Sequence, residues 1–476
     1  AIAAVTYVST LEPTASFWDC GEYIATSYRL EVGHPPGAPT FLLVGRLFSM
    51  FAAPENVAYM VNLMSALSSA FTILFLFWTI TALALKIFKL KNEDSDLEVG
   101  DQAAIFGSAI VGALAYTFSD TFWFSAEEGE VYALSSMMTA ITFWAILKWE
   151  QIAHEPKADR WIILIAYLIG LSIGIHLLNL LAIPAIAYVI YFKKYKPNLR
   201  GIVIAGAVGV FALGGIQGFI IPGIVSMAAK FEFAFVNTFG APFHSGSIIF
   251  IFLLLGAIVY GIFYTMKTNR STWNTALLSL LVLIIGYSSF TLIMIRSNAN
   301  TPIDENNPEN LVNLLAYLNR EQYGESPLAY GQQFNSPLDP QQQYLDGDPV
   351  YYPDDRTGKY ELADDRKASK PNYHPDFKTI FPRMWSTKGN HIKAYKQWSN
   401  FKGKPVKFRD GSGRTQTINK PTFIENMRYF FNYQVGWMYF RYFMWNFSGR
   451  QNDHQGHGGF EDGNWLTGVS FIDEAH

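Results

Sequence analysis

Two carboxylates near the amino terminus have a spacing that suits acid–base chemistry. Asp19 and Glu22 lie three residues apart in the segment SFWDCGEYIATSYRLEVGHPPGAP (residues 16–39), so a helix would place them on one face. Adjacent carboxylates raise one another's pKa, which provides a base and a partner for general acid–base catalysis. The alternative is that both are solvated or cap a short interfacial helix, and the two residues alone do not decide.

The turn that follows this pair is stiff. In His34-Pro35-Pro36-Gly37, each proline fixes its own φ and biases the residue before it toward extended geometry. The favoured interpretation is structural, a fixed entry into the apolar segment 38–54. Direct participation of His34 in a reaction is the alternative.

A second acidic stretch, DTFWFSAEEGEVY (residues 120–132), contains no lysine or arginine. Glu127, Glu128 and Glu130 therefore have no local cation and would pair with a distant arginine or a metal. Glu130 lies where an apolar helix enters the membrane, a depth at which ionisable groups are costly and often functional. A solvated helix N-terminus, favoured by the helix dipole, fits Glu127 and Glu128 better.

Three polar residues stand beside or within later apolar segments. His176 and Asn179 lie in the turn GIHLLN, where His176 is either an ordinary core histidine or lines a polar cavity. Arg296 closes the last apolar segment, where it either snorkels to the surface or binds a lipid phosphate.

The segment FIENMRYFFNYQVGWMYFRYFMWNF (423–447) has 12 aromatic residues among 25. Tryptophan and tyrosine favour membrane interfaces, so we expect an amphipathic segment that lies on the membrane. The sharper alternative is stacking on a sugar or contact with an acceptor peptide by Trp437, Tyr439 or Trp445.

Composition restricts the class of protein. The chain of 476 residues is 50% hydrophobic and 16% charged, whereas soluble domains average about 25% charged residues. A net charge of −3 excludes a strongly basic nucleic-acid binder. The single cysteine, Cys20, excludes a disulfide framework and a cysteine-based zinc site. No P-loop, Rossmann fingerprint or H-E-x-x-H motif is present.

Apolar runs and loop charges predict the topology. We expect about nine membrane helices: a remnant at 1–12, then 57–85, 102–118, 131–149, 161–175, 178–192, 201–220, 247–266 and 274–295. One set of loops holds twelve lysines and arginines and the other three, which assigns the first set to the cytoplasm. Each span takes the chain to the other side of the membrane, so 16–56 is one outer loop, with 38–54 lying along the interface. The same alternation places 297–476 outside as well.

The predicted fold class is therefore mainly α. We expect a polytopic helical membrane domain (1–296) followed by an extracytoplasmic domain (297–476) that is α/β or irregular, with an interfacial aromatic segment at 423–447. Because the first residue is not methionine and residues 1–12 are too short to span, we expect the chain to begin inside a helix.

Three motifs resemble a known family. WDCGEYI…GHPPGAP, FWFSAEEGEVYAL and REQYGESPLAYG resemble the family called domain of unknown function 2723, common in Bacteroidetes-type bacteria. Its eukaryotic branch, the transmembrane protein 260 type, is a protein O-mannosyltransferase. The large first outer loop and later outer domain look like the GT-C class of membrane glycosyltransferases, which use polyprenyl-linked sugars. The resemblance is strongest over 16–185, 311–332 and 430–456.

The resemblance implies a transfer reaction and roles for particular residues. It implies an inner-membrane enzyme that moves a sugar from a polyprenyl phosphate to Ser/Thr of exported proteins, with inversion, facing the periplasm. Asp19 matches the catalytic first-loop carboxylate of GT-C enzymes, and Glu22 is the second choice. The expected donor-binding residues are His34, Glu130, Tyr132, His176, Asn179 and Arg296. Candidates for acceptor, sugar or phosphate contact are Trp437, Tyr439, Arg441 and Arg450.

Partners and cofactors follow from the same resemblance. The expected partners are membrane lipid, the polyprenyl-linked donor, exported acceptor proteins and the translocation machinery, with no nucleic acid. No metal is expected for this reaction. The rival reaction, transfer of an oligosaccharide from a lipid diphosphate, usually needs a divalent ion, for which Glu127 and Glu130 are weak candidates. A non-catalytic scaffold of a secretion complex and a transporter remain alternatives, although no internal repeat supports a transporter.

Overall fold

The computed structural model describes residues 1–91, 96–452, 454 and 461–474. It divides the chain into two compact units, Ala1–Gln322 and Tyr323–His476. We describe each unit by itself.

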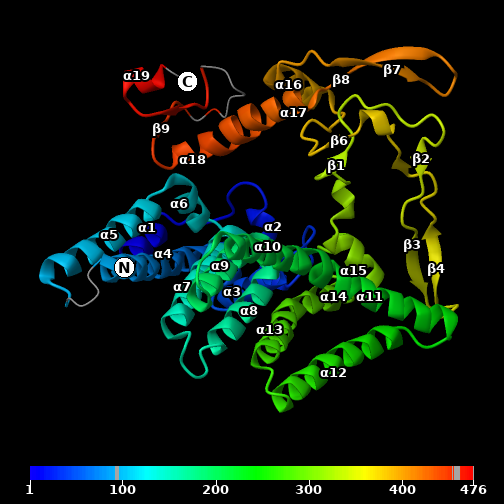
Figure 1. The fold of residues 1–476 in the computed structure, drawn as a ribbon. Coiled ribbons are helices and arrows are strands. Elements are labelled where there is room, and N and C mark those ends of the chain that lie inside the picture. Colours follow the sequence, from blue (N-terminus) through cyan, green and yellow to red (C-terminus); the bar gives the residue numbers. More distant parts are fainter. Residues whose placement is uncertain (92–95, 453, 455–460, 475–476) are drawn as a thin grey trace. The chain divides into compact units, whose positions relative to one another are not determined.

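Unit 1 is built from helices (Figure 1). Before the first long helix come α1 (Ile2–Ser9), α2 (Cys20–Arg29), α3 (Pro39–Ser49) and η1 (Pro54–Asn56). The helices that follow are α4 (Val57–Lys91), α5 (Val99–Thr117), α6 (Asp120–Glu127), α7 (Val131–Ile152), α8 (Arg160–Ile173), η2 (Leu177–Leu181), α9 (Ala182–Lys194), α10 (Leu199–Gly215), η3 (Ile216–Ile220), α11 (Ile221–Phe233), η4 (Ala234–Thr238), α12 (Ser245–Lys267), α13 (Ser271–Tyr287), η5 (Ser288–Phe290), α14 (Thr291–Ser297), α15 (Leu311–Leu318) and η6 (Glu321–Tyr323).

The chain is a polytopic helical membrane protein, as predicted. Within the described residues, seven helices are long and apolar enough to span a membrane, which corrects the expected nine. They are Pro54–Lys89, Val99–Thr117, Val131–Ile152, Leu177–Lys194, Leu199–Thr238, Ser245–Lys267 and Ser271–Ser297. The two missing spans are short helices: α1 has 8 residues and α8 has 14. At 1.5 Å per residue, α8 extends about 21 Å, less than the roughly 30 Å of hydrocarbon.

Close helix contacts depend on glycine at the packing surface. A Cβ at Gly170 of α8 would lie 2.3 Å from the carbonyl oxygen of Leu283 on α13, and one at Gly286 would lie 2.5 Å from the backbone nitrogen of Leu171. The two backbones therefore touch, as small residues allow between membrane helices. The main apolar core includes the fully buried side chains of Phe41, Met64 and Trp149.

The helix α3 has one buried face and one apolar exposed face. Phe41 and Leu42 are buried, whereas Leu43 and Leu47 are about half exposed. With 11 residues, α3 is too short to span, which agrees with the predicted interfacial helix in 38–54.

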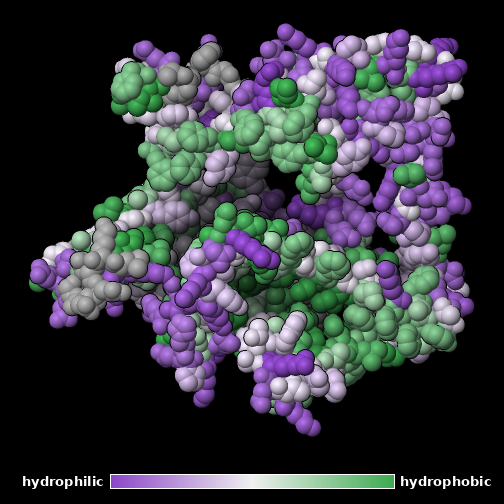
Figure 2. Space-filling model, in the orientation of Figure 1, coloured by the Kyte–Doolittle hydropathy of each residue, from purple (hydrophilic) through white to green (hydrophobic). Residues whose placement is uncertain are grey.

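Unit 2 combines small hairpins with helices. Its antiparallel two-stranded sheets pair β1 (Tyr330–Gly331) with β6 (Thr379–Ile380), β2 (Tyr344–Leu345) with β5 (Lys370–Pro371), β3 (Val350–Asp354) with β4 (Lys359–Asp364), β7 (Lys404–Arg409) with β8 (Thr415–Lys420), and β9 (Gly449–Arg450) with β10 (Trp465–Leu466). Its helices are η7 (Pro375–Phe377), α16 (Gly389–Ser399), α17 (Phe423–Tyr429), η8 (Phe430–Phe440), α18 (Arg441–Trp445) and α19 (Ser470–Asp473). Figure 2 shows hydrophilic residues over β3, β4 and β7, and apolar residues over α11 and α12 of unit 1.

The aromatic segment 423–447 is helical through Trp445. The elements α17, η8 and α18 follow one another without a break, and η8 is an eleven-residue π-helix. Phe431, Tyr439 and Phe447 are more than half exposed. Exposed aromatic rings are what an interfacial segment requires, and contact of this segment with a membrane stays a prediction.

The two compact units divide later than the end of the last span. The predicted boundary at 296/297 falls at the last residue of α14, but the first unit continues to Gln322. Residues 298–322 return to the helical unit: the backbone N–H of Val32 donates to the carbonyl of Ile303, and α15 packs against α11. Residues 298–322 therefore belong to the same unit as the candidate site.

Candidate functional site

The carboxylates of Asp19 and Glu22 belong to α2 but have different surroundings. Asp19 is the N-cap residue of α2, yet its side chain makes no capping hydrogen bond, and it is 59% exposed. The Glu22 side chain is only 25% exposed. The reading of the pair as a helix cap is therefore wrong, because the Asp19 side chain does not bond the free N–H groups of the helix.

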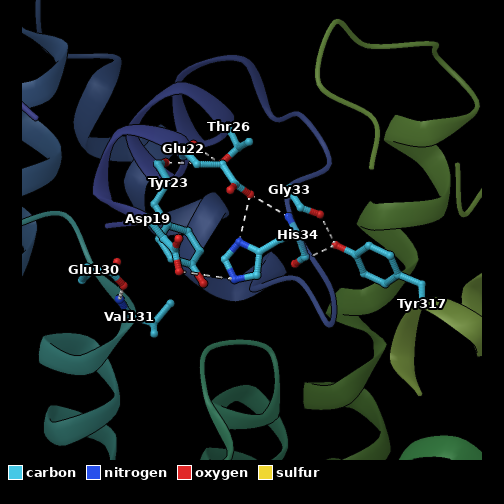
Figure 3. A network of polar contacts seen from close by, with 9 residues as sticks. All are labelled: Asp19, Glu22, Tyr23, Thr26, Gly33, His34, Glu130, Val131 and Tyr317. Carbon is cyan, nitrogen blue, oxygen red and sulfur yellow. Dashed lines mark hydrogen bonds and ion pairs between the residues drawn. The ribbon is translucent and has the colours of Figure 1, made fainter. Parts of the chain in front are cut away.

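His34 connects the two carboxylates (Figure 3). Its Nδ1 lies 3.0 Å from Oε1 of Glu22, its backbone N–H donates to the same oxygen at 2.6 Å, and its Nε2 lies 3.9 Å from Oδ2 of Asp19. The hydrogen bond to Glu22 raises the pKa of His34. Burial acts to raise the pKa of Glu22, but the hydrogen bonds from His34 outweigh it, so the pKa lies below its usual value. Glu22 and His34 thus form a charge-assisted pair beside the more accessible Asp19.

The loop that carries His34 is braced from the far end of unit 1. The hydroxyl of Tyr317, on α15, donates to the carbonyl of Gly33 at 2.6 Å, and its ring is fully buried. Gly33 leaves room for the Glu22 carboxylate, because a Cβ there would lie 2.4 Å from Oε1 of Glu22. Gly37 has φ of +70°, and a Cβ there would meet the Tyr317 hydroxyl at 2.6 Å. The sequence analysis favoured a structural role for the HPPG turn, a fixed entry into the segment 38–54. In the structure the turn also holds His34 against Glu22.

The acidic stretch before α7 lies beside the same segment. The Ser16 hydroxyl donates to the carboxylate of Glu128, and the backbone N–H of Glu12 donates to the carbonyl of Glu127 at 3.3 Å. Glu130 is 5% exposed and caps α7 by accepting from the Val131 N–H. Burial raises the pKa of Glu130 to about 7, with smaller contributions from the charges of Glu128 and Asp19. Glu130 can therefore carry a proton at neutral pH.

Aromatic rings and the turn after α8 complete the surroundings. The ring of Tyr23 lies edge-on to His34 at 5.5 Å between centroids, and Tyr132 lies 5.5 Å from His176. The backbone N–H of Thr40, at the start of α3, donates to the carbonyl of Gly174 in that turn at 2.8 Å. The starts of α3 and α7 and the end of α8 thus lie near one another.

Two expected donor-binding residues have local structural partners. Arg296 donates from Nε to the carbonyl of Leu30 at 2.5 Å and from a terminal nitrogen to that of Arg29, so it binds the C-terminal end of α2. Asn179 is fully buried and donates to the Thr142 hydroxyl at 3.1 Å. Phosphate or donor contact by either residue stays a prediction.

One of the candidates in unit 2, Arg441, is a buried arginine among aromatic rings. The Arg441 guanidinium lies 3.9 Å from the centroid of the Trp437 ring and 4.8 Å from that of Trp445, and the residue is 3% exposed. The guanidinium of Arg450 also lies near Trp445, 4.3 Å from the centroid of its ring. Tyr439 is 67% exposed. Arg441 therefore serves the packing of this aromatic cluster, and the four candidates belong to a different unit from Asp19.

One group of side chains in the described part of the chain has the geometry to hold a metal ion. Ligand atoms of Asp19, Glu22 and His34 all lie within 4.8 Å of one another. The weak metal candidates Glu127 and Glu130 do not belong to this group, and metal binding by them stays a prediction. One histidine and two carboxylates are a donor set that suits Zn²⁺ or Mn²⁺.

The sequence analysis missed Tyr317, Gly33 and Ser16. None carries a local signal: Tyr317 is 284 residues from the carbonyl that it binds. The one available hint was that the family resemblance continued over 311–332, beyond the last span.

Comparison with known proteins finds a family model that matches the part of the chain containing these residues. Residues 19–199 match the family model described as "Protein O-mannosyl-transferase TMEM260 N-terminal domain". The match begins at Asp19 and includes Glu22, His34 and the 120–132 stretch. Residues 19–199 are thus similar to the TMEM260 N-terminal domain. The number 2723 is not confirmed, and residues 324–431 match a different model, a family of unknown function (DUF8416).

Curated relatives of this domain carry the same description. A protein of Dictyostelium discoideum named protein O-mannosyl-transferase tmem260 is 25% identical over 248 residues, which are 49% of this chain and 28% of that protein. The protein O-mannosyl-transferase TMEM260 of Mus musculus is 25% identical over 173 residues, 36% of this chain and 22% of its own length. The chain thus spans less than a third of these relatives. No solved structure matches the chain significantly.

Proposed function

We propose that this TMEM260-type protein is a membrane glycosyltransferase. It transfers a sugar from a polyprenyl-phosphate donor to Ser/Thr hydroxyls of exported proteins, at the outer face of the bacterial inner membrane. The observation that carries the proposal is the convergence of Asp19, Glu22 and His34 in the loop that opens a TMEM260-type domain. The names of the relatives support protein O-mannosylation as the reaction class.

In this reaction Asp19 acts as the general base. Its carboxylate takes the proton of the acceptor hydroxyl while the hydroxyl oxygen attacks the anomeric carbon of the sugar. The bond from that carbon to the phosphate oxygen breaks, and the polyprenyl phosphate leaves with the electron pair. One displacement at the anomeric carbon inverts its configuration.

Asp19 is a better base than Glu22 for a geometric reason. The Glu22 oxygen nearest the site already accepts two hydrogen bonds from His34, whereas the Asp19 side chain is 59% exposed and its contact to His34 is 3.9 Å. An incoming hydroxyl can therefore reach Asp19 without breaking a hydrogen bond. Glu22 instead holds His34, whose positive charge would favour the phosphate of the donor.

The decisive experiment is the Asp19→Asn variant in the native host, with mass analysis of exported glycoproteins. We expect glycan occupancy to fall at least about 100-fold, because general bases contribute roughly 10²- to 10⁴-fold. The matched control is Glu12→Gln, a carboxylate on the same segment that bonds Thr14 at the surface. Unchanged occupancy with normally inserted Asp19→Asn protein would refute the assignment.

The metal-competent group gives the oligosaccharyltransferase alternative one supporting observation. A divalent ion held by Asp19, Glu22 and His34 would occupy the carboxylate that we assign as the base. Treating membranes with EDTA and then restoring Mn²⁺ distinguishes the two reactions. Full activity in EDTA agrees with the base, whereas loss and recovery would establish the metal-dependent alternative.

A further inference from the structure

The residue directly before Asp19 has an unusual combination of properties. Trp18 has φ of +60°, in the left-handed region that bulky side chains avoid. Its ring gains little from packing, because the residue is 81% exposed. A strained backbone and an exposed large aromatic ring are both unfavourable in the isolated protein, and strained residues gather at sites that bind ligands.

The chain on both sides of Trp18 is firmly attached. On one side, Ser16 donates to Glu128, and the carbonyl oxygens of Glu12 and Thr14 accept from the side-chain amide of Asn62 on α4. On the other side, Cys20 begins α2 and is fully buried. The backbone that carries the Trp18 ring is therefore a short stretch attached at both ends, and Asp19 is the next residue along it.

The exposure of Trp18 indicates which substrate it meets. On the proposed reaction, the donor is lipid-linked and reaches the site from the bilayer, whereas the acceptor polypeptide arrives from water. Asp19 and Trp18 form the more exposed side of the site, and Glu130 and Tyr23 form the more buried side. Tryptophan is a frequent anchor in protein recognition, because its large ring has few rotatable bonds to immobilise.

We propose that Trp18 is the acceptor-binding platform of this site. The ring packs against residues that flank the acceptor Ser/Thr in an extended polypeptide segment and thereby brings the hydroxyl to Asp19. This inference rests on the proposed function and extends it to substrate recognition.

The test uses the full chain reconstituted in liposomes, with a mannosyl phosphate of a polyprenol and a Ser/Thr-containing peptide as probes. The variant is Trp18→Gly, which removes the ring and leaves a residue that adopts positive φ without strain. We expect the KM for the peptide to rise about tenfold, with kcat and the KM for the donor within about twofold of the original.

The matched control is Phe17→Ala, at the neighbouring exposed aromatic residue, which is 73% exposed and has no left-handed backbone. We expect it to leave all three constants within about twofold. An equal effect of both variants would overturn the proposal in favour of a membrane anchor. A rise in the donor KM with an unchanged peptide KM would overturn it in favour of sugar stacking.

A binding measurement separates this inference from the proposed function. Fluorescence anisotropy of a labelled peptide with the same proteoliposomes needs no turnover. The original chain could bind the peptide about tenfold more tightly than Trp18→Gly does and yet transfer no sugar. That result would support peptide binding by Trp18 and refute the proposed reaction. Equal peptide binding by the original chain and the variant refutes the platform whatever the activity.

Discussion

Glu130 shows how burial can prepare a side chain for proton chemistry. It is 5% exposed and lies at the start of a membrane helix. The charges of Glu128 and Asp19 raise its pKa, and the charge of His34 lowers it. Its raised pKa follows mainly from loss of water around the charged form. Asp19, one helix away, remains accessible to solvent. Two carboxylates of one site thus differ because their surroundings differ.

The pKa of Glu130 predicts the pH dependence of stability. Between pH 4.5 and about 7 the folded protein keeps a proton that the unfolded chain has lost, so stability falls as the pH rises through this window. The loss amounts to no more than about 3 kcal/mol. Glu130→Gln removes the contribution of Glu130 to this loss of stability. Thermal unfolding of the solubilised full chain at pH 5 and pH 8 measures the difference. Glu127→Gln is the control and should keep the loss of stability between pH 5 and pH 8. An equal loss of stability in Glu130→Gln would contradict the assignment.

At the scale of elements, the site depends on α15. This helix begins at Leu311, after the last span has ended at Ser297, and its Tyr317 reaches the carbonyl of Gly33. The loop that contains the HPPG turn is therefore held between α2, through Glu22, and α15.

Removing the Tyr317 hydroxyl should loosen this loop. In Tyr317→Phe the buried Gly33 carbonyl loses its donor, so we expect a loss of about 1–3 kcal/mol in stability and a lower kcat with a nearly unchanged KM for the donor. Unfolding curves and transfer kinetics measure the two effects. Tyr323→Phe, at a 54% exposed tyrosine of the neighbouring turn, is the control. A change in stability without any change in kcat would show that the brace does not position His34.

Two glycine-to-alanine variants test the contact between the HPPG loop and α2. Gly33→Ala places a Cβ against Oε1 of Glu22, so the bond from His34 has to break or the loop has to move. We expect transfer to fall at least about tenfold, because small misplacements of reacting groups are costly. Gly21→Ala is the control within α2, since its Cβ would make only an ordinary 3.7 Å contact. Equal activity of both variants would refute the positioning role of the loop.

At the scale of the whole molecule, the membrane topology can be tested chemically. The single cysteine, Cys20, is fully buried, so it gives little background labelling. We expect Glu155→Cys to be protected from a membrane-impermeant maleimide in intact spheroplasts, and Thr357→Cys to be labelled, because positive charge assigns the 153–159 loop to the cytoplasm. Both should react after lysis. Labelling of Glu155→Cys in intact cells would reverse the orientation.

The sequence by itself determined the helical membrane class, most span positions and the acidic pair in the first loop. Apolar runs such as 247–266 are long enough to fix a helix without reference to the rest of the chain, and the distinctive motifs indicated the family. Helix bounds such as the 14 residues of α8 could not be predicted, because tertiary packing decides where an apolar run stops being helical.

Only the tertiary structure decided how the surroundings of the acidic residues differ. Spacing places Asp19 and Glu22 on one face, but it cannot show that His34 binds Glu22 and leaves Asp19 accessible. The positive φ of Trp18 and the reach of Tyr317 across 284 residues were equally hidden. The physical reason is that pKa, exposure and hydrogen bonding depend on neighbours in space, which spacing along the chain does not specify.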